Sequence, residues 1–219
     1  MNVSERDELM KLQAHFLVCG FLLLTVLMGN AGEVYGAENP YPEDWFYKDA
    51  SKLEPLIGKR APNIYIKKWM NGPVRKKDIK GKILVLNFWA TWCPTCMDYL
   101  PRINKFSKRF KKKGVAFLGI CGSKSGQEQM ADVVREKNLA YPIGRDHTLK
   151  TEKAWKVSWY PTNIVVGRDG KIVAAGVKSS CIGKLLKRIL KAEKKGATEE
   201  EEGKRKKKKR KRKKNKKNE

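Results

Sequence analysis

A hydrophobic run near the middle of the chain, residues 83–90, is interrupted by one polar residue, Asn87. A run of this length without strict alternation suits a strand that is buried on both faces of a sheet. Beyond it, hydrophobic residues recur at steps of three or four, as on one face of a helix: Cys96, Leu100, Ile103, Phe106 and Phe110. We therefore predict a strand-to-helix junction at Cys93.

Further hydrophobic patterns predict an α/β domain around that junction. Four more segments have the length and composition of strands, and three have the spacing of helices. The expected strands are residues 115–120, 141–143, 163–166 and 171–177, and the expected helices are residues 126–138, 149–155 and 181–190. Ser179 and Ser180 precede the last helix, so a serine is available as its N-cap.

The segment before the central run has the pattern of a hairpin. Residues 63–69 alternate well enough for a strand, and Asn71-Gly72-Pro73 is a turn signal. Val74 and Arg75 can return along the first strand. We therefore expect an N-terminal hairpin ahead of the main sheet.

The N-terminal region contains a second hydrophobic segment, residues 16–28. Its length suits the core of a signal peptide better than a full membrane span, and a cleavage site fits near Ala31. The preceding residues lack the usual positive bias, however. We predict a signal peptide or membrane anchor at residues 1–31, with cleavage and retention both open. A lipoprotein at Cys19 is rejected, because Val18 is too large for the position before a lipidated cysteine.

Composition divides the remaining chain into three parts. Residues 32–57 are rich in Pro, Gly and acidic residues, which indicates a linker or an extension packed on the domain edge. Its aromatic residues are expected to pack on the domain rather than at a lipid interface. Residues 58–195 carry the strand and helix patterns and form the predicted domain. Residues 196–219 are so rich in charge that we expect a disordered, highly basic tail.

The formal net charge of the chain is +26, from 49 Lys and Arg against 23 Asp and Glu. The run from Lys204 to Lys217 is basic at every position except Asn215. Such a run binds the anionic surface of a membrane or cell wall, or nucleic acid by counterion release. It contains no aromatic residues for base stacking, and an exported chain does not usually meet nucleic acid. The anionic surface is therefore the favoured partner.

Cys93 and Cys96 form a Cys-x-x-Cys motif at the predicted junction. The first turn of a helix has unpaired backbone N–H groups and partial positive charge, which stabilise a thiolate. A free thiol with a pKa of about 8.5 is mostly protonated at neutral pH, so this position favours Cys93 as the attacking sulfur. Cys96, one turn further along, can attack the mixed disulfide that Cys93 would form. Pro94 suits the first helical position.

These residues resemble the thioredoxin superfamily. The tract Trp89-Ala90-Thr91-Trp92-Cys93-Pro94-Thr95-Cys96 is most similar to its exported, membrane-tethered branch, which includes TlpA-like and ResA-like proteins. Pro101 stands where the family carries a proline, and Gly58 begins a stretch similar to that branch's domain start. The resemblance implies a thioredoxin-like fold: a central mixed sheet flanked by helices, with an N-terminal hairpin and a central insert.

The resemblance also implies the site and its reaction. Trp159-Tyr160-Pro161-Thr162 stands where the family has a cis-proline facing the cysteines, so Trp92, Pro94, Tyr160 and Pro161 would bind the substrate and Cys93–Cys96 would be the redox disulfide. The implied activity is extracytoplasmic (periplasmic) thiol–disulfide exchange, acting as a reductant. Implied partners are a membrane thiol donor and exported dithiol or disulfide proteins such as apocytochrome c.

Two positions depart from the family's pattern. Asn87 stands where plain thioredoxins carry a buried Asp, and Tyr99 stands where the tethered branch usually has Glu. Asp98 is one residue away but about 100° round the helix. We expect water, or Tyr99 as a hydrogen-bond partner, rather than Asp98, to manage the proton of Cys96.

The sequence lacks the motifs that other cysteine chemistries require. A zinc site would need a second cysteine pair or histidine cluster, and His15 and His147 lack ligand spacing, so no metal and no cofactor are expected. A peroxiredoxin would need Pro-x-x-x-Thr-x-x-Cys, which neither Cys93 nor Cys96 supplies. Cys121 and Cys181 could form a second redox pair, but are better interpreted as small buried hydrophobes. The competing function is a non-catalytic binding module that acts through its basic tail.

Overall fold

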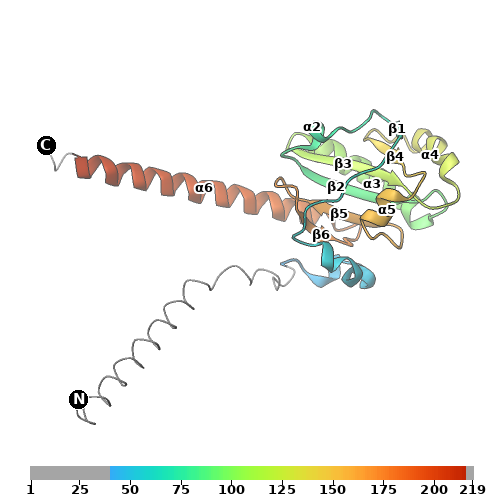
Figure 1. Ribbon diagram of the computed structural model, residues 1–219, viewed down its shortest axis with the longest axis horizontal. Coiled ribbons are helices and arrows are strands. Elements are labelled where there is room, and N and C mark those ends of the chain that lie inside the picture. The colour runs from blue at the N-terminus through green and yellow to red at the C-terminus, as the bar shows by residue number, and fades with distance from the viewer. Residues whose placement is uncertain (1–39, 216–219) are drawn as a thin grey trace, which may run out of the picture. The chain divides into compact units, whose positions relative to one another are not determined.

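The computed structural model describes residues 40–215, and their side chains as far as residue 208. Its centre is a six-stranded mixed sheet in the order β1-β4-β3-β2-β5-β6 (Figure 1). β2 is parallel to β3 and β3 to β4, whereas the pairs β1–β4, β2–β5 and β5–β6 are antiparallel. The strands are β1 (Lys68–Met70), β2 (Ile83–Trp89), β3 (Val115–Cys121), β4 (Ile143–Arg145), β5 (Thr162–Val166) and β6 (Ile172–Ala175).

Helices cover the sheet, as the sequence predicts for this fold class. The α-helices are α2 (Lys76–Ile79), α3 (Pro94–Lys111), α4 (Met130–Glu136), α5 (Lys150–Ala154) and α6 (Ile182–Asn215). Three 3₁₀ segments complete the set: η1 (Glu43–Trp45), η2 (Lys48–Leu56) and η3 (Gln127–Gln129). Figure 1 shows that α6 continues well beyond the sheet.

Every residue of β2 is buried, which confirms the prediction of a strand covered on both faces. Successive residues of a strand point to opposite faces, and the two hydrophobic clusters divide accordingly. Val85 belongs to the cluster that contains Leu100 of α3 and Leu185 of α6. Leu86 belongs to the other cluster, with Trp155 at the end of α5.

The extension before residue 58 packs on the domain where the structure describes it. Phe46 forms a bridge with Val177 and is 9% exposed, while Leu53 of η2 is completely buried. Ala50 lies so near Gly176 that a Cβ on the glycine would approach the Cβ of Ala50 to 2.6 Å. These contacts agree with the expectation that the aromatic residues of this segment pack on the domain.

The predicted N-terminal hairpin is wrong. β1 pairs with β4, at the edge of the sheet, rather than with residues that follow the turn. The turn itself forms, with Asn71 and Gly72 at positive φ, and the Asn71 side chain donates to the carbonyls of Leu139 and Tyr141. The chain then enters α2, where the N-cap residue Arg75 and Asp78 bond to each other. The turn forms as predicted, but the residues that bond to Asn71 and the strand that pairs with β1 lie in the central insert.

The central insert is present between β3 and β5. It contains η3 and α4, where the sequence predicts a single helix over residues 126–138, and then β4 and α5. α6 begins at Ile182, so Cys181, and neither of the two serines, stands directly before it. The Ser179 hydroxyl instead accepts a hydrogen bond from the buried Asn163 side chain at 3.0 Å.

The tail predicted to be disordered at residues 196–219 is described as far as Asn215, and there α6 continues as a helix. Its last four residues lie outside the described part of the chain. Lys, Arg, Glu and Ala have high intrinsic helix propensity. Ion pairs one turn apart, Lys195–Glu199 and Glu200–Lys204, add local support. A charged segment can therefore be helical without burying apolar surface.

The signal peptide or anchor predicted at residues 1–31 lies outside the described residues, as does the first part of the segment predicted to be a linker. Within residues 40–215, no helix combines the length and hydrophobicity needed to cross a bilayer.

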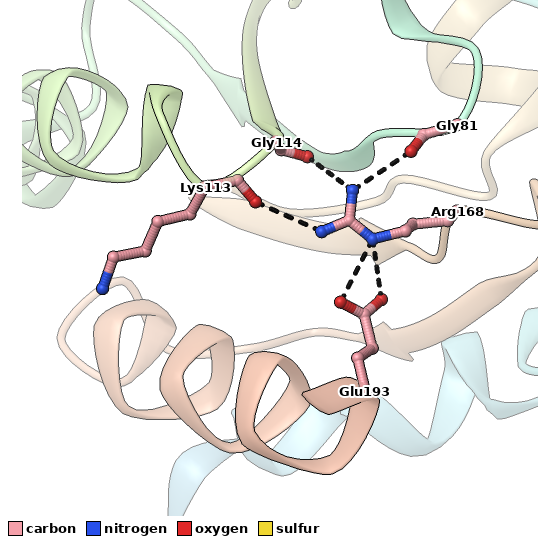
Figure 2. Close-up of polar contacts among 5 residues, drawn as sticks. All are labelled: Gly81, Lys113, Gly114, Arg168 and Glu193. Atoms are coloured by element: carbon pink, nitrogen blue, oxygen red, sulfur yellow. Dashed lines mark hydrogen bonds and ion pairs between the residues drawn. The ribbon is translucent and has the colours of Figure 1, made fainter. Parts of the chain in front are cut away.

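Arg168, in the turn between β5 and β6, ties three parts of the fold together (Figure 2). Its terminal nitrogens donate to the carbonyls of Gly81, Lys113 and Gly114 at 3.1–3.2 Å, and its Nε pairs with Glu193 of α6 at 3.1 Å. The Ile83 backbone N–H donates to the Gly114 carbonyl, so this cluster lies at the start of β2, the end opposite Cys93. Arg168 therefore fixes the first turns of α6 to the domain.

Replacing Arg168 by alanine should destabilise the domain by about 1–3 kcal/mol, because three backbone carbonyls and one carboxylate lose their donor. The free energy of unfolding in urea measures the effect. Arg168→Lys is the matched control: it keeps the charge near Glu193 but cannot reach all three carbonyls, so most of the loss should persist. Full recovery with lysine would mean that charge alone matters.

Candidate active site

Cys93 and Cys96 lie at the junction between β2 and α3, as predicted. Cys93 is the N-cap residue of α3 and Pro94 is its first helical residue. A disulfide joins Cys93 to Cys96, with a Cα–Cα distance of 5.2 Å. The backbone N–H of Cys96 donates to the Cys93 sulfur at 3.1 Å. The motif thus places one sulfur against the free N–H groups of an 18-residue helix, which stabilise negative charge there.

Two aromatic side chains lie beside the disulfide. Trp92 precedes Cys93 and is 56% exposed, an unusual state for a large hydrophobic residue. Its ring meets that of Tyr160 edge to face, with centroids 5.7 Å apart. The Tyr160–Pro161 peptide bond is cis, as the family pattern implies. The structure therefore brings Trp92 and Tyr160, far apart in the sequence, into contact next to the cysteine pair.

The loop after β3 holds Trp92, a contact that no sequence pattern indicates. Ser123 has positive φ, and its Oγ accepts from Trp92 Nε1 at 2.9 Å. Thr91, just before Trp92, donates to the carbonyl of Gly126 at 2.8 Å. The loop at residues 122–126 thus fixes the tryptophan through bonds to its indole and to the preceding threonine.

Glu152 of α5 is a buried carboxyl group that sequence reasoning missed. It accepts hydrogen bonds from the Tyr160 hydroxyl and from the backbone N–H of Ser123. Gly122 makes room for this pair, because a Cβ there would meet the Tyr160 hydroxyl at 2.6 Å and Glu152 even closer. Glu152 therefore orients the ring of the residue before the cis-proline.

Burial is the main cause that raises the pKa of Glu152. Hydrogen bonds from Tyr160 and Ser123 act in the opposite direction, and the neighbouring carboxyl of Asp146 adds to the rise. Asp146 is itself fully buried and accepts the backbone N–H of Glu152 at 2.8 Å. Burial first, and then the bond to Glu152, also raise the pKa of Tyr160. In this pair the neutral Tyr160 hydroxyl donates and the Glu152 carboxyl group accepts. Burial disfavours the ionised form of that carboxyl group.

Replacing Glu152 by glutamine should leave its acceptor oxygen but remove the charge. A carboxyl whose folded-state pKa is raised binds its proton more tightly when folded, so stability is lost as pH rises above the ordinary value near 4.5. The variant's stability relative to wild type should therefore increase with pH over that window. Urea unfolding from about pH 4 to about pH 8 measures this. The exposed Glu128→Gln should show no such trend, and a flat difference for Glu152→Gln would contradict the argument.

The side chain of Asn87 is buried and bonds to the neighbouring strand β5. Its side-chain amide donates to Asn163 Oδ1 at 2.7 Å, and Asn163 in turn donates to the carbonyl of Val177. Tyr99 is half-buried and lies near enough to Tyr47 to contribute to that residue's raised pKa, which burial mainly causes. In the described part of the chain, no hydrogen bond joins Tyr99 to either cysteine. Asp98 is exposed, as expected.

Cys121 and Cys181 are both free and buried, so the structure contains no second bridge between them. Cys121 ends β3 and is completely buried, which raises the pKa of its thiol to about 12, although Arg145 opposes the shift. The interpretation of these cysteines as buried hydrophobes agrees with this placement. His147 is exposed, and residues 40–215 contain no cluster of His, Cys, Asp and Glu that could hold a metal ion.

Cys121 should therefore resist alkylation in the folded, reduced protein, because only the thiolate reacts and burial disfavours it. Brief treatment with iodoacetamide at neutral pH, followed by mass spectrometry of the peptides, should label Cys93 but leave Cys121 intact. The same treatment in urea should label both. Rapid native labelling of Cys121 would contradict its burial.

A mixed sheet with helices on its faces, and a cysteine pair at the N-terminus of the helix after the central strand, define a thioredoxin-like thiol–disulfide oxidoreductase. The AhpC/TSA family matches residues 57–175, more than half of this sequence. The chain belongs to that family.

Individual relatives agree with this class. Thiol-disulfide oxidoreductase ResA of Bacillus cereus is 31% identical over 128 residues, which are 58% of this chain and 72% of that protein. ResA of Bacillus subtilis is 29% identical over 126 residues, which are 57% and 69% of the two chains. The thioredoxin domain of a thiol-disulfide oxidoreductase from Bacteroides vulgatus has the same fold: its TM-score is 0.54 at 23% identity, covering 61% of this chain and 97% of that domain. The resemblance stated from the sequence is thereby confirmed.

Proposed function

We propose that this oxidoreductase reduces disulfide bonds of exported proteins, with Cys93 as the attacking sulfur and Cys96 as the resolving sulfur. The observation that carries the proposal is the position of Cys93 at the start of α3, where the backbone N–H of Cys96 donates to its sulfur. The relatives that are named thiol-disulfide oxidoreductases support the same chemistry.

The reaction has two exchange steps. The Cys93 thiolate attacks one sulfur of the substrate disulfide; the Cys93–substrate bond forms, the substrate S–S bond breaks, and a substrate thiolate leaves. The Cys96 thiolate then attacks the Cys93 sulfur, which releases the second substrate thiolate and closes the Cys93–Cys96 disulfide. Two electrons pass from the protein to the substrate. A membrane thiol donor restores the dithiol by the reverse exchange.

The substrate groove in this proposal is lined by the two aromatic residues and by the prolines that follow them in the chain. Trp92 and Pro94 are both exposed beside the disulfide. Tyr160 precedes the cis-bonded Pro161, and its backbone is suited to pairing with an extended substrate chain by strand addition. Trp92 would cover the apolar side of that chain. The proposal therefore assigns substrate binding to Trp92, Pro94, Tyr160 and Pro161.

The proposed setting is the extracytoplasmic side of a bacterial membrane. The leader at residues 1–31 would either anchor the chain or be removed near Ala31, and residues 32–57 would join it to the domain. Exported dithiol proteins, apocytochrome c among them, would be the substrates. The basic run from Lys204 to Lys217 would bind an anionic membrane or cell-wall surface, each residue contributing about 1 kcal/mol at low salt.

The reduction potential of the Cys93–Cys96 pair tests the direction of exchange. Equilibration with redox buffers of known potential, followed by trapping of free thiols, should give a value nearer that of thioredoxin, about −270 mV, than that of the oxidant DsbA, about −120 mV. A potential near the oxidant's value would reverse the proposed role.

A further inference from the structure

A cationic cavity lies at the end of the sheet where the parallel strands β2, β3 and β4 finish, which is also the end that precedes the disulfide. It has a volume of about 480 Å³ and lies between the extended segment before β1 and the loop that joins β4 to α5. Its charged lining residues are all basic: Lys67, Lys68, Arg145 and Lys150, with His147 beside them. Its apolar lining includes Tyr65, which is 47% exposed. The cavity therefore offers positive charge around an apolar surface.

These positive charges are available for an external partner. In the described part of the chain, no ion pair involves Lys67, Lys68, Arg145 or Lys150. The acids nearest in sequence, Asp146 beside Arg145 and Glu152 after Lys150, are both buried. An anion in this cavity would therefore meet cations that form no ion pair among the residues that the structure describes.

The strand register places this cavity at the same end of the sheet as the cysteines. Trp89 pairs with Cys121, and Cys121 pairs with Arg145, along three adjacent parallel strands. Neighbouring strands lie about 4.8 Å apart, so Arg145 is about 10 Å along the sheet edge from the end of β2. Cys93 follows that end by four residues. An extended chain covers about 10 Å in three residues.

Hydrogen bonds connect the cavity to the tryptophan beside the disulfide. Arg145 Nε donates to Gln127 Oε1 at 3.1 Å, and the Gln127 amide donates to the carbonyl of Ser123. Ser123 Oγ accepts from Trp92. The guanidinium at the cavity is therefore held in a fixed place relative to the ring beside the cysteines.

We propose that this cavity is a substrate subsite that selects an acidic segment of the protein undergoing exchange, a few residues from its reacting cysteine. The inference rests on the proposed function, since it assumes a polypeptide substrate at Cys93. The carboxylates pair with Lys67, Lys68, Arg145 and Lys150, and an apolar side chain packs on Tyr65. The site thus favours acidic substrates over neutral ones at the same disulfide.

The test compares peptide substrates with an intramolecular disulfide. One carries three Glu residues starting three positions before its cysteine, a second carries them after it, and a third has Gln at all these positions. Full-length protein with a Lys67→Gln, Lys68→Gln, Lys150→Gln triple substitution is compared with wild type and with Lys76→Gln, Lys77→Gln, Lys80→Gln. The second triple removes the same charge from exposed residues in and just after α2, near the opposite end of β2.

Wild type should reduce one of the acidic peptides with a kcat/KM about tenfold above the neutral peptide, a preference that added salt weakens. The cavity triple should lower this ratio to about twofold, and the α2 triple should retain it. Equal ratios in the two triples would overturn the inference, because overall charge would then explain the preference. No preference in wild type would also overturn it. Failure of wild type to reduce any peptide would instead overturn the proposed function, and the subsite with it. Thermal unfolding curves verify that both triples are folded.

Discussion

Replacing Cys93 by serine is expected to lower disulfide reduction by about 10³-fold or more, because a hydroxyl at the start of α3 cannot form the mixed disulfide. The reduction of insulin with dithiothreitol as electron donor measures the loss. Cys96→Ser should behave differently: its Cys93 can still attack, so mixed disulfides with the substrate accumulate instead of being resolved. The two variants together separate attack from resolution.

Cys181→Ala is the matched control for these variants. It removes a buried thiol that takes part in no disulfide and should retain insulin reduction. Comparable turnover by Cys93→Ser and wild type would contradict the assignment of Cys93. Negligible turnover by both would favour the alternative drawn from the sequence, a binding module without catalysis.

Replacing Trp155 by alanine should cost about 3–5 kcal/mol of stability, because it removes a large side chain from the core. Trp155 is completely buried at the end of α5, where its ring lies 6.2 Å from that of Phe88. Its Nε1 donates to the carbonyl of Asn63 at 3.2 Å. The substitution would leave a cavity and an unpaired carbonyl. Urea unfolding of the full chain measures the change.

Trp155→Phe separates the two parts of this effect. Phenylalanine keeps a ring against Phe88 but lacks the donor for Asn63, so a smaller loss, about 1–2 kcal/mol, is expected. A loss in Trp155→Ala no larger than this would mean that the surrounding core collapses into the space. Because α5 also carries Glu152, reduced turnover in the alanine variant would connect core packing to the orientation of Tyr160.

Local patterns were sufficient for the centre of this fold. The uninterrupted run that contains Asn87 predicted a strand covered on both faces, because few other structures bury so many consecutive residues. The Cys-x-x-Cys spacing and the helical periodicity after it predicted the junction at Cys93. The cis-bonded Pro161 was accessible only through the resemblance to a family, since periodicity says nothing about a peptide bond's isomer.

The contacts around the cysteines were not predictable in the same way. Ser123, Glu152 and Tyr160 come from a loop, a helix and a second loop, and they meet only once β2, β3 and β5 are in register. Nothing near Glu152 in the sequence marks it as buried, and a charged residue is exposed by default. Gly122 was a usable signal, because a glycine directly after a buried strand often marks a close approach of other atoms.

Two predictions, the N-terminal hairpin and the disordered tail, differ from the structure. Both extend a local sequence signal to structure that the signal does not determine. The turn at Asn71 exists, but the partner of β1 is a strand more than 70 residues later, and a turn does not specify that choice. The charges of the C-terminal tail predict disorder because they cannot form a core. Helix formation needs no core when residues of high propensity and Lys195–Glu199 ion pairs follow one another.

The continuation of α6 determines how its basic run could engage a surface. At 1.5 Å per residue, the stretch from residue 196 to residue 215 is about 30 Å long as a helix. A coil of the same composition must surrender chain entropy to line up its positions, whereas positions along a helix recur at set intervals, every third or fourth on one side. The surface binding proposed above would therefore depend on which helical positions are basic as well as on how many are.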